Sequence, residues 1–135
     1  LTGRRTRDLA AAQMWRAVAR CRHGGGFFAC LDWQPGGEAL WNAIKGYLPT
    51  ILTGVPSGDT KRYTKQKRDW CFRRLGPHVE VICCWSRDKY QWATPESLLI
   101  DDREQNGRAW QKAGGVFIHH TSLENTLKEL QRLGL

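Results

Sequence analysis

Apolar residues recur along this chain at two spacings, and these predict strands and helices in alternation. Short apolar runs bounded by glycine, proline or polar residues are typical of strands. Apolar residues repeated every three or four positions are typical of helices. The strands are predicted at 50–53, 79–85, 98–100 and 116–118, and the helices at 8–20, 38–45, 60–75, 106–113 and after residue 121.

Residues at the helix ends support this assignment. Gly46 lies where a C-cap glycine belongs, after the second predicted helix. Thr121 and Glu124 have the spacing of a capping box at the start of the last helix. The alternation of strands and helices indicates an α/β fold, in which a parallel sheet is flanked by helices.

Polar residues follow each predicted strand, at the end where ligands bind in parallel sheets. They are Thr53, Arg87 with Lys89, Asp101 with Asp102, and His119 with His120. A hydroxyl, basic side chains and an acidic pair at one edge predict a site for a phosphate group and a divalent cation. Each residue alone has a simpler explanation, as a turn residue, a solvated cation or a helix cap. Their combination at one edge favours the site.

The predicted site has the groups that bind a phosphate in transfer. The Thr53 hydroxyl can donate to a phosphate oxygen, and so can the backbone N–H groups of Gly54 and Val55. Lys67 or Lys89 can supply a positive charge. These groups would stabilise the charge that develops on the phosphoryl oxygens.

Carboxylate oxygens are the ligands that Mg²⁺ prefers, and Asp101 and Asp102 supply them. One would bind the metal and the other would hold a neighbouring lysine. The five cysteines have no metal-binding spacing, and Cys83 and Cys84 are adjacent within an apolar run. Mg²⁺ is therefore the predicted cofactor, and the cysteines are interpreted as reduced thiols of an intracellular protein.

Charge widens the choice of partners. The chain has 21 Lys and Arg against 13 Asp and Glu, a net charge of +8. This balance suits a nucleotide, a nucleic acid or an RNA-rich assembly, although an ordinary basic protein explains it equally well. No apolar run approaches the roughly 20 residues of a membrane span, and no apolar segment follows the basic start as in a secretory signal. The expected location is the cytoplasm or an organelle matrix.

Three motifs resemble those of a known family. Residues 51–56 (Ile-Leu-Thr-Gly-Val-Pro) resemble the second motif of 5'(3')-deoxyribonucleotidases, with one residue added and a glycine in place of a serine. Residues 86–89 (Ser-Arg-Asp-Lys) resemble their Arg-Asp-Lys turn, and residues 98–103 (Leu-Leu-Ile-Asp-Asp-Arg) resemble their fourth motif almost letter for letter. The resemblance covers about residues 26–120 and is to the haloacid dehalogenase (HAD) superfamily.

The resemblance implies a HAD-like, Rossmann-like parallel sheet over residues 26–135. It implies that residues 1–25, with the helix predicted at 8–20, match part of a small helical cap. The activity implied is magnesium-dependent hydrolysis of a nucleotide or another phosphorylated small molecule.

The resemblance also implies roles for individual residues. Thr53 and Lys89 would take part in catalysis, and Asp101 and Asp102 would serve the metal. The residues implied to lie near the substrate are Phe28, Gly54, Lys67 and Arg87.

The family's nucleophile is missing. It lies on the first strand as Asp-x-Asp-x-Thr, and Asp-x-Asp occurs nowhere in these 135 residues. Either that strand precedes this sequence, or the motif has decayed within 27–34, where Asp32 is followed by Gln34. By the resemblance, the missing strand lies between the strands that end in Thr53 and Asp101, whose edges would otherwise be unpaired. An upstream segment, another chain or a rearranged pairing is predicted to fill that place.

Two functions remain open. One is a HAD-type phosphohydrolase whose nucleophile is supplied upstream. The other is a catalytically inactive HAD-like module that binds within a larger, RNA-containing assembly. The second is favoured by residues 61–74, which contain seven basic residues and one acid. Its candidate nucleic-acid contacts are Lys61, Arg62, Lys65, Arg68 and Arg73.

Overall fold

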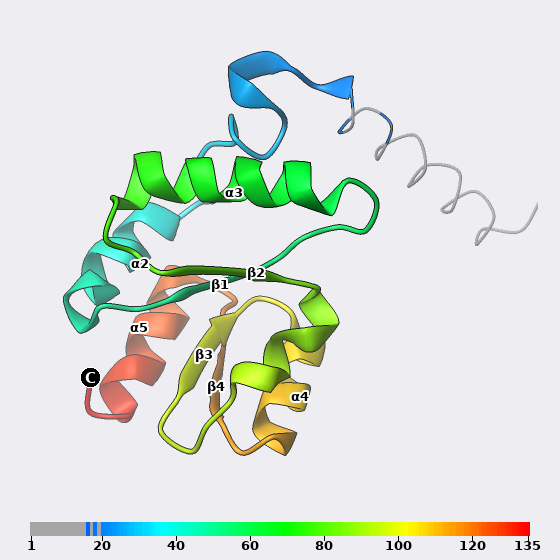
Figure 1. The fold of residues 1–135 in the computed structure, drawn as a ribbon. Coiled ribbons are helices and arrows are strands. Elements are labelled where there is room, and N and C mark those ends of the chain that lie inside the picture. The colour runs from blue at the N-terminus through cyan, green and yellow to red at the C-terminus, as the bar shows by residue number, and fades with distance from the viewer. Residues whose placement is uncertain (1–15, 17, 19) are drawn as a thin grey trace, which may run out of the picture.

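The computed structural model describes residues 16, 18 and 20–135 of this protein (Figure 1). The helix predicted at 8–20, and most of the segment 1–25 interpreted as a cap, lie outside the described residues. The strands are β1 (Ile51–Gly54), β2 (Val81–Cys84), β3 (Leu98–Asp101) and β4 (Val116–His119). The helices are α2 (Gly37–Ile44), α3 (Thr60–Leu75), α4 (Glu104–Lys112) and α5 (Leu123–Arg132), and the 3-10 helices are η1 (His23–Gly25), η2 (Lys45–Tyr47) and η3 (Ser86–Trp92).

The predicted α/β class is confirmed, but the strands do not form one sheet. β1 pairs in parallel with β2, and Thr53 lies opposite Cys83. β3 pairs in parallel with β4, and Asp101 lies opposite His119. The described strands thus form two separate two-stranded sheets. In the first, α3 lies in the connection between the two strands, and in the second α4 does.

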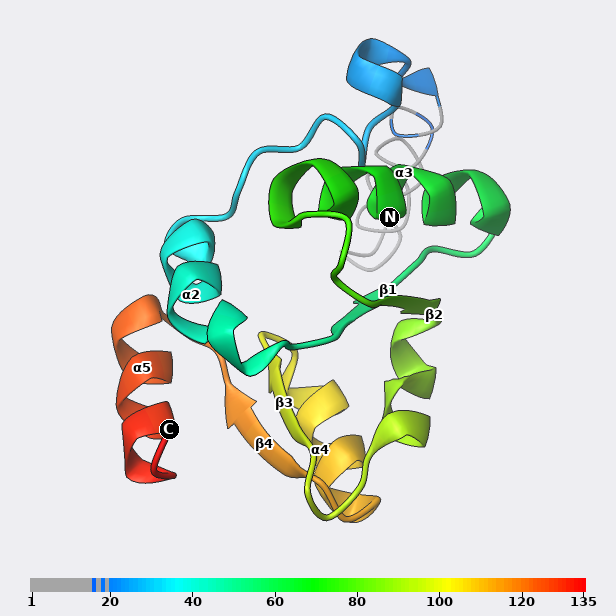
Figure 2. The ribbon, with the colours of Figure 1, turned by 60° about the vertical axis from the view of Figure 1, so that its left-hand side comes forward.

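The helices cover the two strand pairs separately (Figures 1 and 2). α3 runs across the β1–β2 pair and contacts β2. α4 contacts both β3 and β4, and α5 contacts β4 and α2. Among the described residues, no helix is both long enough and apolar enough to cross a membrane.

Helix α3 has the bounds that the sequence predicts. The Asp59 side chain caps its start by accepting a hydrogen bond from the N–H of Arg62, and Gly76, with φ 112°, ends it. Its buried residues are Tyr63, Gln66 and Cys71. The buried face of this helix is therefore partly polar, and its Gln66 side chain accepts a hydrogen bond from the N–H of Phe28.

Two predicted helix ends are wrong. Ser122, and not Thr121, caps α5, because its side chain accepts a hydrogen bond from the N–H of Asn125 at 3.1 Å. After α2 the chain continues into η2, so Gly46 is not the C-cap. The left-handed residue is Leu48, with φ 54°, and its side chain is 88% exposed. The 3-10 turn moves the end of the helical segment beyond Gly46.

Close packing joins α4 to β4. A Cβ atom at Gly107 would lie 1.9 Å from the nearest ring atom of Phe117, so only glycine allows this approach. Trp110 from the same helix is buried, as is Ile118 on β4. The β3–β4–α4 unit therefore has a tight core of its own.

The inner edges of the two strand pairs are not joined. The N–H groups of Ile51 and Val55 donate to carbonyls of the chain beside them, at Glu80 and Cys84. Along a parallel strand, successive residues direct their backbone N–H and C=O groups alternately to one side and the other. The N–H and C=O groups of Leu52 and Gly54 therefore point away from β2.

The same alternation holds in the other pair. The carbonyls of Ser97 and Asp101 accept from the β4 segment, so Leu98 and Ile100 turn their backbone groups away from it. Residues of both β1 and β3 line one cavity of about 400 Å³. All four residues of β1 are only half-buried although two of them are aliphatic. The predicted gap between the Thr53 and Asp101 strands is therefore present in the described residues, and no described strand occupies it.

Candidate phosphate and metal site

The acidic pair that follows β3 divides into one enclosed carboxylate and one exposed carboxylate. Asp101 Oδ2 accepts hydrogen bonds from Lys89 Nζ at 2.8 Å and from Asn106 Nδ2 at 3.0 Å. Asp101 Oδ1 accepts from the N–H of Arg103 at 2.9 Å. Both oxygens of this buried carboxylate are thus engaged.

These contacts keep Asp101 ionised. Burial by itself raises the pKa of a carboxyl group, because it disfavours the charged form. Here the hydrogen bonds from Lys89, the Arg103 N–H and Asn106 outweigh burial, and the pKa of Asp101 lies below its ordinary value. The Lys89–Asp101 pair is enclosed, with side chains only 12% and 5% exposed. Asp101 therefore acts as the anchor that orients Lys89.

A second lysine reaches the end of β1 from helix α3. Lys67 Nζ donates to the Gly54 carbonyl and lies 3.4 Å from the Thr53 hydroxyl oxygen. Burial lowers the pKa of Lys67, and the positive charge of Lys89 lowers it further, while Cys83 and Cys71 act in the opposite direction. The charge of Lys89 therefore acts on Lys67, and Lys89 lines one cavity together with Thr53.

Phe28 completes this part of the site. Its backbone N–H donates to Gln66 Oε1 at 3.0 Å, which fixes the segment after η1 against α3. The Lys67 ammonium lies 4.8 Å from the centre of the Phe28 ring, a cation–π contact. Phe28, Thr53 and Lys67 line a common cavity of about 390 Å³. The structure brings these three predicted residues together.

Gly54 has a structural role beside its predicted one. A Cβ atom there would lie 3.1 Å from the Cβ of Ser86, so glycine lets the end of β1 approach η3 closely. The N–H of Val55 donates to the Cys84 carbonyl at 2.8 Å. The prediction that the Val55 N–H faces a phosphate is therefore wrong, because that group completes the pairing with β2.

Asp102 is the carboxylate that remains for a metal. Its side chain is exposed, and no described residue donates a hydrogen bond to it; only its backbone carbonyl is engaged, 2.9 Å from Nε2 of His119. Within 16, 18 and 20–135, no three His, Cys, Asp or Glu side chains gather as a metal-binding group. Mg²⁺ is commonly held by one or two carboxylates together with water and substrate phosphate. Asp102 could therefore supply one carboxylate to a Mg²⁺ site whose other ligands are water and substrate phosphate.

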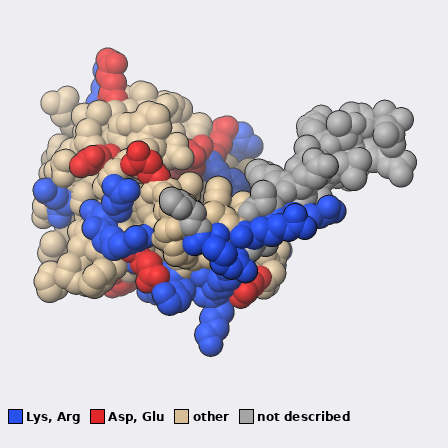
Figure 3. Space-filling model, turned by 90° about the horizontal axis from the view of Figure 1, so that it is seen from above, with Lys and Arg blue, Asp and Glu red and all other residues tan. Residues whose placement is uncertain are grey.

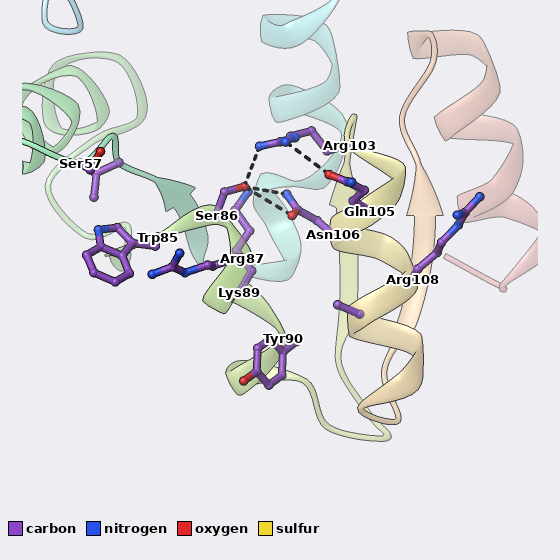
Figure 4. A pocket seen from close by; sticks show the side chains of 12 residues that line it. Ser57, Trp85, Ser86, Arg87, Lys89, Tyr90, Arg103, Gln105, Asn106 and Arg108 are labelled. Carbon is purple, nitrogen blue, oxygen red and sulfur yellow. Dashed lines mark hydrogen bonds between the residues drawn. The ribbon is translucent and has the colours of Figure 1, made fainter.

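Arg87 lies elsewhere. Its guanidinium stacks on the Trp85 ring, 4.5 Å from the ring centre, and it lines a different cavity between η3 and α4 (Figure 4). Ser86, Arg103 and Asn106 in that region were not predicted. A signal for Ser86 was available, because it directly follows a predicted strand, whereas Asn106 stands inside a helix start that sequence patterns place poorly.

The basic residues of α3 serve largely to attach the helix to its neighbours. Arg62, Arg68 and Arg73 donate to the backbone carbonyls of other segments, at Cys21, Val81 and Ala29. Lys65 pairs with Asp69 on the same helix at 2.7 Å. Figure 3, which views the molecule from the α3 side, shows Lys and Arg side chains with Asp and Glu among them. Of the five candidate nucleic-acid contacts, Lys61 is exposed without such a contact to another described residue.

Comparison of the chain with protein-family models, with curated proteins and with solved structures finds no match in any of the three.

Proposed function

We propose that this chain provides the phosphate-binding part of a magnesium-dependent phosphohydrolase of HAD type. The observation that carries the proposal is the convergence of two lysines at the carboxyl ends of β1 and β3. Lys67 contacts Thr53, Lys89 is anchored by Asp101, and the charge of Lys89 lowers the pKa of Lys67. Two cations and a hydroxyl at strand ends form an arrangement suited to a phosphate group.

Each described residue has a distinct task in this proposal. The Lys67 and Lys89 ammonium groups contact the phosphoryl oxygens and offset the charge that develops on them. The Thr53 hydroxyl donates a hydrogen bond to the same group. Asp101 does not touch the substrate; it holds Lys89 in place through the 2.8 Å ion pair. Asp102 contributes a carboxylate to Mg²⁺, which when bound would offset negative charge on the phosphate.

The nucleophile must come from outside these 135 residues, because they contain no Asp-x-Asp. The cavity between β1 and β3 supports that view. It is lined by apolar strand residues and flanked by two edges that no described strand pairs. A further strand there would bring a residue at its carboxyl end beside Thr53 and Lys89.

The test uses the protein with its native upstream sequence. We expect magnesium-dependent release of inorganic phosphate from nucleoside monophosphates or p-nitrophenyl phosphate, measured as initial rates. Lys67→Met should reduce the rate by about 100-fold or more, as expected when one preorganised donor to the developing charge is removed. Lys45→Met is the matched control, because Lys45 is exposed on η2.

Asp102→Asn should raise the Mg²⁺ concentration needed for half-maximal rate. A rate that does not depend on Mg²⁺, or that Lys67→Met leaves unchanged, would show that the proposal is wrong.

The second candidate function is an inactive binding module, possible because the nucleophile is missing from this chain. If the protein with its upstream sequence releases no phosphate but binds RNA with an affinity that falls steeply with salt, that function is favoured.

We also propose an intracellular location, supported by five cysteines that form no disulfide.

A further inference from the structure

A further cavity, of about 670 Å³, lies between η3 and the start of α4 (Figure 4). Its volume is in the range of pockets for small organic ligands. Four of its lining residues are basic, namely Arg87, Lys89, Arg103 and Arg108, and none is Asp or Glu. The cavity is therefore suited to an anion.

Two of these cations are already paired with carboxylates. Lys89 is held by Asp101 at 2.8 Å. Arg108 pairs with Glu104 at 3.0 Å, and Figure 4 shows its side chain turned away from the other labelled residues. The charges left for a ligand are those of Arg87 and Arg103.

Among the described residues, Arg87 and Arg103 have only neutral partners. Arg103 reaches from the start of α4 to the Ser86 hydroxyl oxygen at 3.3 Å and to Gln105 Oε1 at 3.5 Å. Arg87 rests on the face of Trp85. Both guanidinium groups can therefore exchange a weak neutral contact for a charge-assisted one.

The base of the cavity is held rigidly. Asn106 Nδ2 donates to Ser86 Oγ and to Asp101 Oδ2, each at 3.0 Å, which joins α4 to η3 and β3. Arg103 stands at the N-cap of α4, where no side chain caps the helix. The start of α4 therefore holds Arg103 beside this base, with its guanidinium directed to Ser86.

We propose that this cavity binds an organic phosphate that carries a planar ring. Arg87 and Arg103 contact the phosphate oxygens, and the ring packs against Tyr90, whose side chain lines the same cavity and is 43% exposed. Thr53 and Lys67 do not line this cavity, although Lys89 lines both it and the cavity with Thr53. The inference does not rest on the proposed function, because its phosphate contacts are Arg87 and Arg103.

The test uses phosphonates, which a phosphohydrolase does not cleave. Binding of phenylphosphonate, methylphosphonate and inorganic phosphate to the full chain is followed by ligand-observed NMR. We expect saturable binding of phenylphosphonate, tighter than that of the other two. Arg87→Gln and Arg103→Gln should each weaken it by about tenfold, as expected for loss of a charge-assisted hydrogen bond.

Three variants make the result specific. Arg103→Lys should recover part of the affinity, because a lysine keeps the charge without the planar fork. Arg108→Gln should bind phenylphosphonate like the wild type, and Thr53→Val should lose less affinity than Arg103→Gln, because Thr53 does not line this cavity. Circular dichroism checks that each variant is folded. Absence of saturable binding by the wild type would overturn the proposal. So would equal binding of methylphosphonate or inorganic phosphate, or a loss with Thr53→Val as large as that with Arg103→Gln.

Discussion

At the scale of single residues, Asp101 is the side chain on which the candidate site depends most. Its carboxylate is buried and accepts hydrogen bonds from Lys89, from Asn106 and from the N–H of Arg103. We expect Asp101→Asn to lower the free energy of unfolding by about 3–5 kcal/mol, because Lys89 would remain enclosed without its partner. Urea denaturation at pH 7 measures this difference.

The matched control is Asp69→Asn, which breaks the exposed pair with Lys65 and should lower the free energy of unfolding by less than about 1 kcal/mol.

The dependence of this stability on pH has a definite sign. The pKa of Asp101 is lowered in the folded protein, so its contribution is present above the unfolded-state value of about 4 and is lost as the pH falls through the folded value. Asp101→Asn has no carboxyl group at this position, so its free energy of unfolding should fall less than that of the wild type as the pH is lowered. Equal costs for the two variants would contradict the anchoring role of Asp101.

At the scale of elements, the sequence predicts the order of strands and helices well, because periodicity and breakers are local signals. The prediction of a helix at about 60–75 agrees with α3, since Gly76 and Pro77 mark its end in the sequence. The 3-10 helix η3 is missed, because Ser86–Trp92 has no helical repeat of apolar residues. The cap of α5 is misplaced by one residue, since Thr121 and Ser122 are both good caps and tertiary contacts choose between them.

Gly107 gives the sharpest prediction for an element. Alanine favours a helix over glycine by about 1 kcal/mol, but a Cβ atom here would meet the Phe117 ring at 1.9 Å. We therefore expect Gly107→Ala to destabilise the protein by about 1–3 kcal/mol in urea denaturation, as overpacking does. Gly46→Ala is the control, because nothing lies within 4 Å of its Cβ position. Combining Gly107→Ala with Phe117→Leu should restore part of the loss, and a stabilising Gly107→Ala would refute the close packing of α4 on β4.

At the scale of the whole molecule, the pairing of strands could not be derived from local patterns. Apolar runs predict that strands exist, while their order depends on contacts between segments far apart in the sequence. The gap between the Thr53 and Asp101 strands was expected only through the family resemblance. The contact between Lys67 and Thr53 could not be predicted either, because it depends on how α3 packs over β1. The Lys89–Asp101 pair could be predicted, because both residues follow the ends of predicted strands.

The gap leads to a prediction about hydrogen exchange. The backbone N–H groups of Leu52 and Ile100 face away from β2 and β4, toward the cavity that β1 and β3 share. In the present chain they should exchange faster than those of Thr53 and Leu99, which face their partner strands. When the native upstream sequence is included, a strand in the gap would pair both edges and slow the exchange of Leu52 and Ile100 selectively.

Residue-resolved exchange by NMR tests this, with amides of α5 as the internal reference, because that helix lies away from β1 and contacts β4 and α2. Slowing confined to Leu52 and Ile100 would locate the added strand between the two pairs. A uniform slowing that includes α5 would instead report a general gain in stability. No change at either amide would mean that the upstream sequence does not enter the gap, and would favour either a strand from a second chain or the inactive binding module.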